Sequence, residues 1–218
     1  MNSMKETVKK ELEGLIERYP KLCVCREDIE KAYLLLEETY DLGGKLLIAG
    51  NGGSAADSEH IAGELMKRFK VTRPISGEFA EKLKAIDPVR GEKLAKNLEL
   101  PLRAVPLTSH IAITTAYMND ADATGVFAQQ MLGFGDEGDV FLAISTSGNS
   151  ENIISACVVA KAMGIRIIGL TGMKESRLSE VSDLCIRVPE TETYRIQELH
   201  LPVYHCLCLM LESNYFGN

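Results

Sequence analysis

The chain has 218 residues, of which 45% are hydrophobic and 25% charged, and its formal net charge is −7. An acidic excess argues against nucleic acid or a membrane surface as the partner, because phosphate-rich surfaces attract basic patches. No apolar run approaches the ~20 residues of a membrane span, and the first residues lack the apolar core of a signal peptide, so we expect a cytoplasmic protein.

Two helices are expected before the first strand. Ser3-x-x-Glu6 is a capping box that opens a helix ending near Arg18, where Tyr-Pro follows. A second helix is expected over residues 26–42, and two glycines end it. Residues 1–44 should therefore form an antiparallel helical pair that packs on the main domain or on another subunit.

From residue 45 to residue 218 the pattern alternates between apolar strands and helices. Apolar runs of this kind are buried on both faces of a parallel sheet. The segment 70–103 interrupts the alternation with a charged, helix-prone stretch, which we interpret as an insertion of one or two surface helices forming a lid or edge decoration. We expect an α/β fold with a doubly wound, five-stranded parallel sheet flanked by helices, its strands near residues 45–49, 104–108, 139–145, 165–171 and 184–188.

Two of these strands lead through loops of small polar residues into helices. Residues 45–49 precede Gly50-Asn51-Gly52-Gly53-Ser54, and residues 140–144 precede Ser145-Thr146-Ser147-Gly148-Asn149-Ser150. A helix N-terminus has free N–H groups and partial positive charge, so such loops can hold a phosphate. Both loops fall at strand carboxyl ends, where parallel sheets bind ligands. We therefore expect one bipartite site for a phosphorylated polyol, with local dipoles and a few cations holding the anion.

Nucleotide motifs are weak or missing. Gly50-x-Gly52-x-x-Ala55 satisfies a dinucleotide-binding pattern, but the next expected strand comes more than 50 residues later and ends in Thr108-Ser109 instead of an acidic residue. Neither loop contains the Gly-Lys-Ser or Gly-Lys-Thr of a P-loop. We expect no nucleotide cofactor.

Polar residues at helical spacing follow the first loop. Asp57, His60, Glu64 and Arg68 recur every three or four residues on the helix expected from Ser54. Taken alone, they could equally form a solvated polar stripe. The last helix, however, carries Gln197, His200 and His205 among apolar residues, and buried polar groups need partners. A core histidine with satisfied hydrogen bonds remains an alternative for His205.

The six cysteines contain no Cys-x-x-Cys pair, although Cys-x-Cys occurs twice. This spacing matches no familiar zinc or redox framework. We expect reduced cysteines that act as small apolar side chains.

In chain order, these motifs resemble the sugar isomerase (SIS) domain family and, within it, the phosphoheptose isomerases. The resemblance covers nearly the whole chain and implies a flavodoxin-like sandwich. It also implies a homotetramer with sites at subunit interfaces and with the N-terminal helices in the assembly core. The motifs that carry it are Gly50-Asn51-Gly52-Gly53-Ser54, Asp57-x-x-His60-x-x-x-Glu64-x-x-x-Arg68, Asn119-Asp120, Gly138-Asp139-Val140, residues 144–150, Leu170-Thr171-Gly172 and Arg195-Ile196-Gln197-Glu198 with His205.

The resemblance implies an aldose–ketose isomerase that converts D-sedoheptulose 7-phosphate to D-glycero-D-manno-heptose 7-phosphate. Glu64 would be the general base that moves a proton between C1 and C2 through an enediol, and His205 its acid–base partner. Some family members bind zinc at positions matching His60, Glu64, Gln197 and His205, so zinc is left open as a cofactor. The matching substrate-binding positions are Asn51, Gly52, Gly53, Ser54, Arg68, Asn119, Asp120, Ser145, Thr146, Ser147, Ser150 and Gln197.

At three places the sequence departs from the family pattern, which affects how far these residue roles apply to this chain. Tyr194 stands where an aspartate is usual, and Pro202 is expected to bend the last helix between Gln197 and His205. The 70–103 segment is longer than the family pattern. Two alternatives therefore stay open. One is an SIS isomerase acting on another phosphosugar. The other is a non-catalytic SIS protein that binds a phosphosugar or a replication-initiator protein, although members of the replication-initiator-binding type lack the residues matching Glu64 and His205.

Overall fold

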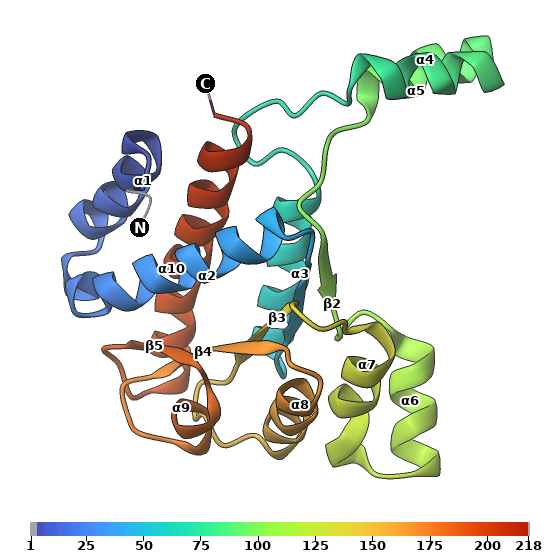
Figure 1. The fold of residues 1–218 in the computed structure, drawn as a ribbon. Coiled ribbons are helices and arrows are strands. Elements are labelled where there is room, and N and C mark those ends of the chain that lie inside the picture. Colours follow the sequence, from blue (N-terminus) through green and yellow to red (C-terminus); the bar gives the residue numbers. More distant parts are fainter. Residues whose placement is uncertain (1–3, 218) are drawn as a thin grey trace.

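Five parallel strands form one sheet at the centre of the computed structural model, which describes residues 4–217 (Figure 1). The strand order is β2-β1-β3-β4-β5, so β1 and β3 are neighbours and pair from Leu46↔Val140 to Ala49↔Ala143. The predicted five-stranded parallel sheet is confirmed. Its strands are β1 (Leu46–Ala49), β2 (Ala104–Pro106), β3 (Val140–Ile144), β4 (Arg166–Gly172) and β5 (Leu184–Val188).

Helices cover both faces of the sheet, because alternate side chains of each buried strand point to opposite cores. Leu46 and Ile48 of β1 pack into one core, whereas Leu47 and Ala49 pack into the other. The first core holds α1 (Glu6–Arg18), α2 (Arg26–Asp41), α3 (Gly53–Met66) and α10 (Thr193–Tyr215). The second holds α7 (Val126–Phe134), α8 (Glu151–Ala162) and the short α9 (Arg177–Val181), with α6 (Ile111–Asp120) beside α7 (Figure 1).

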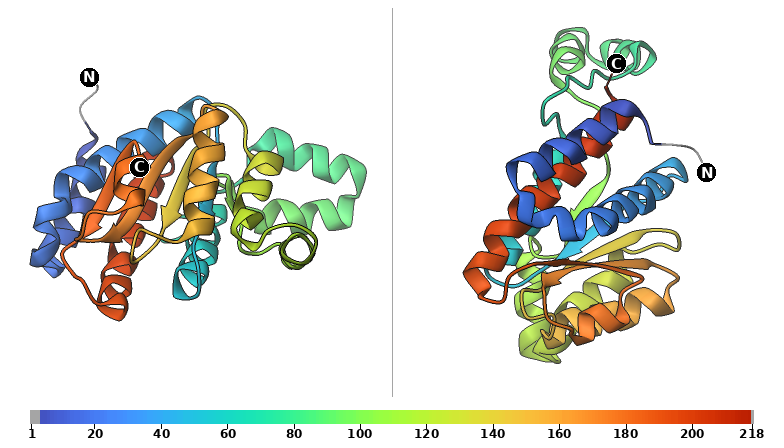
Figure 2. Two further views of the ribbon diagram at one scale, coloured as in Figure 1. Left: turned by 90° about the horizontal axis from the view of Figure 1, so that it is seen from below. Right: turned by 90° about the vertical axis from the view of Figure 1, so that its left-hand side faces the viewer.

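The N-terminal helices lie close to their predicted positions, but α1 packs chiefly on α10 (Figures 1 and 2). A 3₁₀ helix, η1 (Pro20–Cys25), separates α1 from α2 and turns the chain, so the two form no simple antiparallel pair. Val8, Leu12 and Leu15 of α1 are fully buried in the same core as α10. The helix begins after Lys5, which makes no side-chain cap, and the predicted capping residue Ser3 lies outside the described residues.

The predicted insertion at 70–103 contains two surface helices, α4 (Gly77–Ile86) and α5 (Pro88–Asn97). They pack on each other as a hairpin that projects away from the sheet (Figures 1 and 2). Ser76 and Asp87 cap the two helices through their side chains, and this capping explains where each helix begins. The structure confirms surface helices, while a role as a lid remains a prediction.

Two expectations from composition can be compared with the structure. All six cysteines are free, and four of them, Cys25, Cys157, Cys206 and Cys208, are buried as small apolar side chains. Within residues 4–217, no helix has the length and apolar character needed to cross a bilayer.

Candidate functional site

The two polar loops lie side by side at the carboxyl edge of the sheet, as predicted. They follow the paired strands β1 and β3, and a reciprocal pair of amide hydrogen bonds, both 2.9 Å, joins Asn51 after β1 to Asn152 in α8. Asn152 was not predicted, because its partner lies about 100 residues earlier in the chain. Together the loops present the N-termini of α3 and α8 at one edge.

The geometry of the first loop favours glycine at residues 52 and 53. Gly52 has a φ of 57°, a conformation that L side chains rarely adopt. A Cβ atom on Gly53 would overlap the amide of Gln197, which projects from α10 against the start of α3. The structure therefore brings Gln197 to the first loop. Ser54, the next residue, is 3% exposed.

The second loop borders a pocket of about 240 Å³. Ser145 is buried, and its Oγ lies 3.1 Å from Oγ of Ser150 and accepts a 3.1 Å hydrogen bond from the Gly148 N–H. Thr146 and the exposed Ser147 line the pocket. At this size the pocket suits a phosphate and adjoining atoms better than a whole sugar. The remaining lining residues are Asn149, Gly172, Met173, Lys174, Glu175, Glu190, Thr191, Thr193 and Ile196.

Lys174, which sequence reasoning did not single out, lines the pocket together with the carboxylates Glu175 and Glu190. It follows β4, in a segment that also lines the pocket. The rule that ligands bind beyond strand carboxyl ends would have indicated it, because the motif Leu170-Thr171-Gly172 ends just before it. Tyr194, by contrast, is 55% exposed, and its hydroxyl accepts a 2.9 Å hydrogen bond from Arg195.

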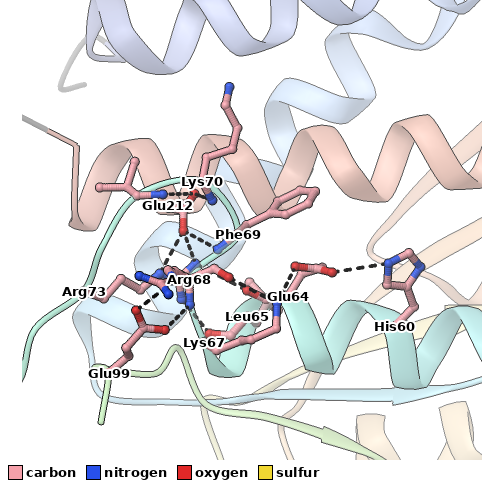
Figure 3. Close-up of polar contacts among 11 residues, drawn as sticks. His60, Glu64, Leu65, Lys67, Arg68, Phe69, Lys70, Arg73, Glu99 and Glu212 are labelled. Carbon is pink, nitrogen blue, oxygen red and sulfur yellow. Dashed lines mark hydrogen bonds and ion pairs between the residues drawn. The ribbon is translucent and has the colours of Figure 1, made fainter. Parts of the chain in front are cut away.

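A second group of functional side chains lies where α3 and α10 run next to each other, and we call His60, Glu64 and His205 the histidine cluster. Nε2 of His60 is 3.4 Å from Oε1 of Glu64, and Figure 3 shows the two side chains pointing toward each other. The rings of His60 and His205 meet edge to face with centroids 4.9 Å apart. Helix α10 continues through Pro202, so the residues after it still reach α3.

The imidazole of His205 is half-buried on α10. Among the described residues, its Nε2 atom is buried and has no hydrogen-bond partner. Burial and the neighbouring His60 lower the pKa of His205, while Glu64 acts in the opposite direction. A neutral imidazole with a free nitrogen can accept or donate a proton near neutral pH. Phe69 covers the ring from the side, with centroids 5.2 Å apart.

The predicted zinc ligands are only partly brought together. His60, Glu64 and His205 are adjacent, and two imidazoles with a carboxylate suit zinc chemically. Gln197 lies beside Gly53, and at 1.5 Å rise per residue it is roughly 12 Å from His205 along α10. Across residues 4–217, no three His, Cys, Asp or Glu side chains are placed closely enough to hold a metal ion.

Arg68 does not lie on the helix that carries His60 and Glu64, which corrects the prediction. Helix α3 ends at Met66, and the guanidinium of Arg68 is about 60% exposed, with its Nε 3.4 Å from Glu99. The helix stops because the backbone turns toward Glu212 of α10. The carboxylate of Glu212 accepts hydrogen bonds of 2.7, 2.7 and 3.1 Å from the N–H groups of residues 69–71 (Figure 3).

Arg73 completes this arrangement, which we call the Glu212 clamp. Arg73 and Glu212 are each 1% exposed, and the guanidinium donates hydrogen bonds of 3.0 and 2.8 Å to Oε1 of Glu212. Arg73 also donates to the backbone carbonyls of Leu65 and Glu64, at 2.7 and 3.3 Å, and so caps the end of α3 (Figure 3). Sequence reasoning missed both residues, since only the tertiary fold pairs them.

Asn119 and Asp120 are exposed at the end of α6. Their side chains bond to each other, with Nδ2 of Asn119 2.8 Å from Oδ1 of Asp120. In the described part of the chain, the hydrogen bonds of these two side chains do not reach either polar loop. Their predicted contact with substrate remains a prediction.

Comparison with known proteins places this site in a family. The SIS domain model matches residues 24–97 and 94–172. A phosphoheptose isomerase of Akkermansia muciniphila is 35% identical over 214 residues, which cover 98% of this chain and 100% of that protein. A phosphoheptose isomerase of Aneurinibacillus thermoaerophilus is 40% identical over 190 residues, with 87% and 83% covered.

Solved structures agree with the sequence relatives. The phosphoheptose isomerase of Neisseria gonorrhoeae aligns with a TM-score of 0.69 at 30% identity, covering 94% of this chain and 91% of that one. The enzyme of Francisella tularensis aligns with a TM-score of 0.71 at 28% identity, covering 98% and 100%. The chain therefore belongs to the SIS domain family, as an isomerase of the phosphoheptose isomerase type.

Proposed function

We propose that the chain interconverts D-sedoheptulose 7-phosphate and D-glycero-D-manno-heptose 7-phosphate. The observation that carries this proposal is the histidine cluster, where a carboxylate lies near an imidazole whose Nε2 atom is buried and free of hydrogen bonds. An aldose–ketose isomerase needs such a pair, because the proton on carbon is weakly acidic and charge develops on the carbonyl oxygen. The names of the curated relatives point to the same substrate class.

In the proposed mechanism, Glu64 removes the proton from C1 of the ketose. The electron pair of the broken C–H bond forms the C1–C2 double bond of an enediol, and His205 donates a proton to the C2 oxygen. Glu64 then returns its proton to C2, while His205 takes the proton from the C1 oxygen, which yields the aldose. Both residues end in their starting protonation states, so the cycle can repeat.

The second loop is proposed to hold the phosphate. The N–H groups at the start of α8 and the hydroxyls of Thr146, Ser147 and Ser150 supply donors, and Lys174 supplies positive charge. Holding the phosphate fixes the distant carbonyl end relative to the acid and the base. Substrate binding at Asn51, Gln197, Arg68, Asn119 and Asp120 belongs to the same proposal.

Two copies of the chain are proposed to complete one site, in line with the expected homotetramer. Glu64 lies roughly 16 Å along α3 from the first loop at 1.5 Å per residue, and Ile196 at the pocket lies nine residues before His205. The phosphate pocket and the histidine cluster are therefore separated along one protomer. Ile111 and Met118 of α6 are 75% and 49% exposed, which is the kind of apolar surface that subunit contacts cover. Sedimentation velocity measures the assembly state.

Zinc remains a prediction from the family resemblance. His60, Glu64 and His205 are the residues that would hold it, but across residues 4–217 no such group of side chains is placed closely enough to do so, and no step of the proposed mechanism runs through a metal. Metal analysis of the purified protein tests for zinc.

The function is tested by incubating the protein with D-sedoheptulose 7-phosphate in deuterated water, with and without added zinc, and following C2 by NMR. Deuterium at C2 of the aldose is expected, because a proton held by Glu64 exchanges with solvent before it returns. Binding of the sugar phosphate without turnover or label would instead support a non-catalytic SIS protein. Turnover of a different phosphosugar alone would keep the mechanism and replace the substrate.

A further inference from the structure

A hydrogen-bonded chain of side chains reaches the histidine cluster from Asp57. The hydroxyl of Tyr204 lies 3.1 Å from Oδ1 of Asp57 and 3.0 Å from Nδ1 of His60. Asp57 and His60 lie one turn apart on α3, and Tyr204 reaches both from α10. Because Tyr204 is only 1% exposed, its hydroxyl depends on these two partners.

The protons on this chain can be assigned from the chemistry of the three groups. A phenol carries one proton, and an ionised carboxylate can only accept hydrogen bonds. The Tyr204 proton therefore goes to Asp57, and the Tyr204 oxygen accepts the proton on Nδ1 of His60. At neutral pH a phenol keeps its proton, since its ordinary pKa is about 10, and an ordinary carboxyl group is ionised.

We propose that Asp57 and Tyr204 are positioning residues that hold His60 as its Nδ1–H tautomer and direct the Nε2 lone pair toward Glu64. The groups that face the ring are Glu64, 3.4 Å from Nε2, and the His205 ring, with centroids 4.9 Å apart. Hydrogen-bond partners of this kind orient histidines at reactive centres.

The tautomer decides which state of Glu64 is stabilised. After Glu64 takes a proton from the sugar carbon, its O–H can donate to the Nε2 lone pair, so the protonated acid is stabilised while it holds the proton. The opposite tautomer would place an N–H group there and stabilise the carboxylate, which weakens the base. This consequence rests on the proposed function of Glu64, whereas the tautomer itself does not.

The first test reads the tautomer directly in the full-length protein without substrate. In ¹⁵N–¹H spectra of histidine-labelled protein at pH 8, the His60 signals are assigned by their loss in His60→Gln. The proposal expects a proton on Nδ1 and a bare Nε2. A neutral ring with its proton on Nε2 would overturn it. Because no turnover is involved, this result stands apart from any failure of the proposed function.

The second test removes only the phenolic hydroxyl, in Tyr204→Phe. The His60 side chain is 43% exposed and then keeps Glu64 as its remaining acceptor within the protein, so the proton is expected to move to Nε2. The kcat should fall by about 10- to 100-fold with KM little changed. The matched control is Tyr33→Phe, since Tyr33 is also fully buried and donates a 2.7 Å hydrogen bond to Glu37 on α2. An unchanged tautomer and kcat in Tyr204→Phe would contradict the proposal.

Discussion

Two polar clusters lie between α3 and α10, and they differ in how completely their hydrogen bonds are made. In the Glu212 clamp, the guanidinium of Arg73 and both oxygens of Glu212 are paired (Figure 3). In the histidine cluster, Nε2 of His205 is buried without a partner. A saturated buried network stabilises a fold, whereas a buried group left unpaired costs stability and needs another explanation. We infer that the clamp holds the two helices together, whereas the free nitrogen of His205 leaves that ring open to the proton transfer proposed above.

The charge states of the two clusters differ in the same way. Burial by itself would raise the pKa of Glu212, but hydrogen bonds from Phe69, Lys70 and Arg73 outweigh it, and the pKa is lowered. Glu212 therefore stays ionised and paired. For His205, burial is the main influence and lowers the pKa, which favours the uncharged ring.

Breaking the clamp should have the largest effect on stability. Glu212→Ala leaves the buried Arg73 charge and three N–H groups unpaired, so the free energy of unfolding should fall by about 3–5 kcal/mol. Urea unfolding followed by circular dichroism measures it. Glu11→Ala removes a partner that lies 3.4 Å from the exposed ammonium of Lys70 and should cost less than about 1 kcal/mol. Similar small losses in both variants would mean that the clamp does not stabilise the protein.

His200, a fully buried histidine on α10, should make the stability of the protein depend on pH. Burial lowers its pKa from 6.5 to about 4, against a smaller opposite influence of the Thr171 backbone. Below pH 6.5 the His200 ring of the unfolded chain takes up a proton, whereas the ring of the folded chain does so only near pH 4. The free energy of unfolding is therefore highest above pH 6.5. It should fall by about 3 kcal/mol between pH 6.5 and 4, at about 1.4 kcal/mol per pKa unit.

Unfolding free energies of the wild type and of His200→Phe across this pH range measure the effect. The variant lacks the titrating ring, so its stability should change less with acid, whatever its stability at pH 7. Parallel pH curves for the two proteins would show that His200 does not titrate as its burial implies.

A smaller effect, on substrate binding, is expected in the second loop, which is proposed to hold the phosphate. Ser147→Ala removes one exposed hydroxyl that lines the pocket and should raise KM for the sugar phosphate by about 3- to 10-fold, the cost of one hydrogen bond. Steady-state kinetics provide the measurement, and kcat should change less. Ser213→Ala, on α10 away from this pocket, serves as the control. Equal KM values in the two variants would remove Ser147 from the phosphate site.

Much of the fold could be predicted because its signals are local. Apolar strands followed by Gly-Asn or Ser-Thr loops marked β1, β3 and the helices after them, and parallel pairing placed both loops at one edge. The spacing of His60 and Glu64, four residues apart on a helix, likewise fixed their contact in advance.

The remaining features depend on contacts between distant residues. Helical periodicity extended α3 to Arg68, but Glu212, more than 140 residues later, draws the backbone out of the helix after Met66. The sequence did not single out Tyr204, because the adjacent His205 was taken as the polar residue of that helical turn. The hydrogen bond from Tyr204 to Asp57 forms only when α10 packs against α3. The periodicity of a sequence describes each helix separately, so it cannot predict which residues of two different helices will pair.

The most direct test of the account compares Glu64→Gln with Glu59→Gln, a matched change at an exposed position of the same helix. In deuterated water, Glu64→Gln should lose about 10²- to 10⁴-fold in label uptake at C2, while the sugar phosphate still binds and the free energy of unfolding is nearly unchanged. Glu59→Gln should exchange like the wild type. Undiminished exchange in Glu64→Gln would contradict the claim that the histidine cluster carries the proton transfer.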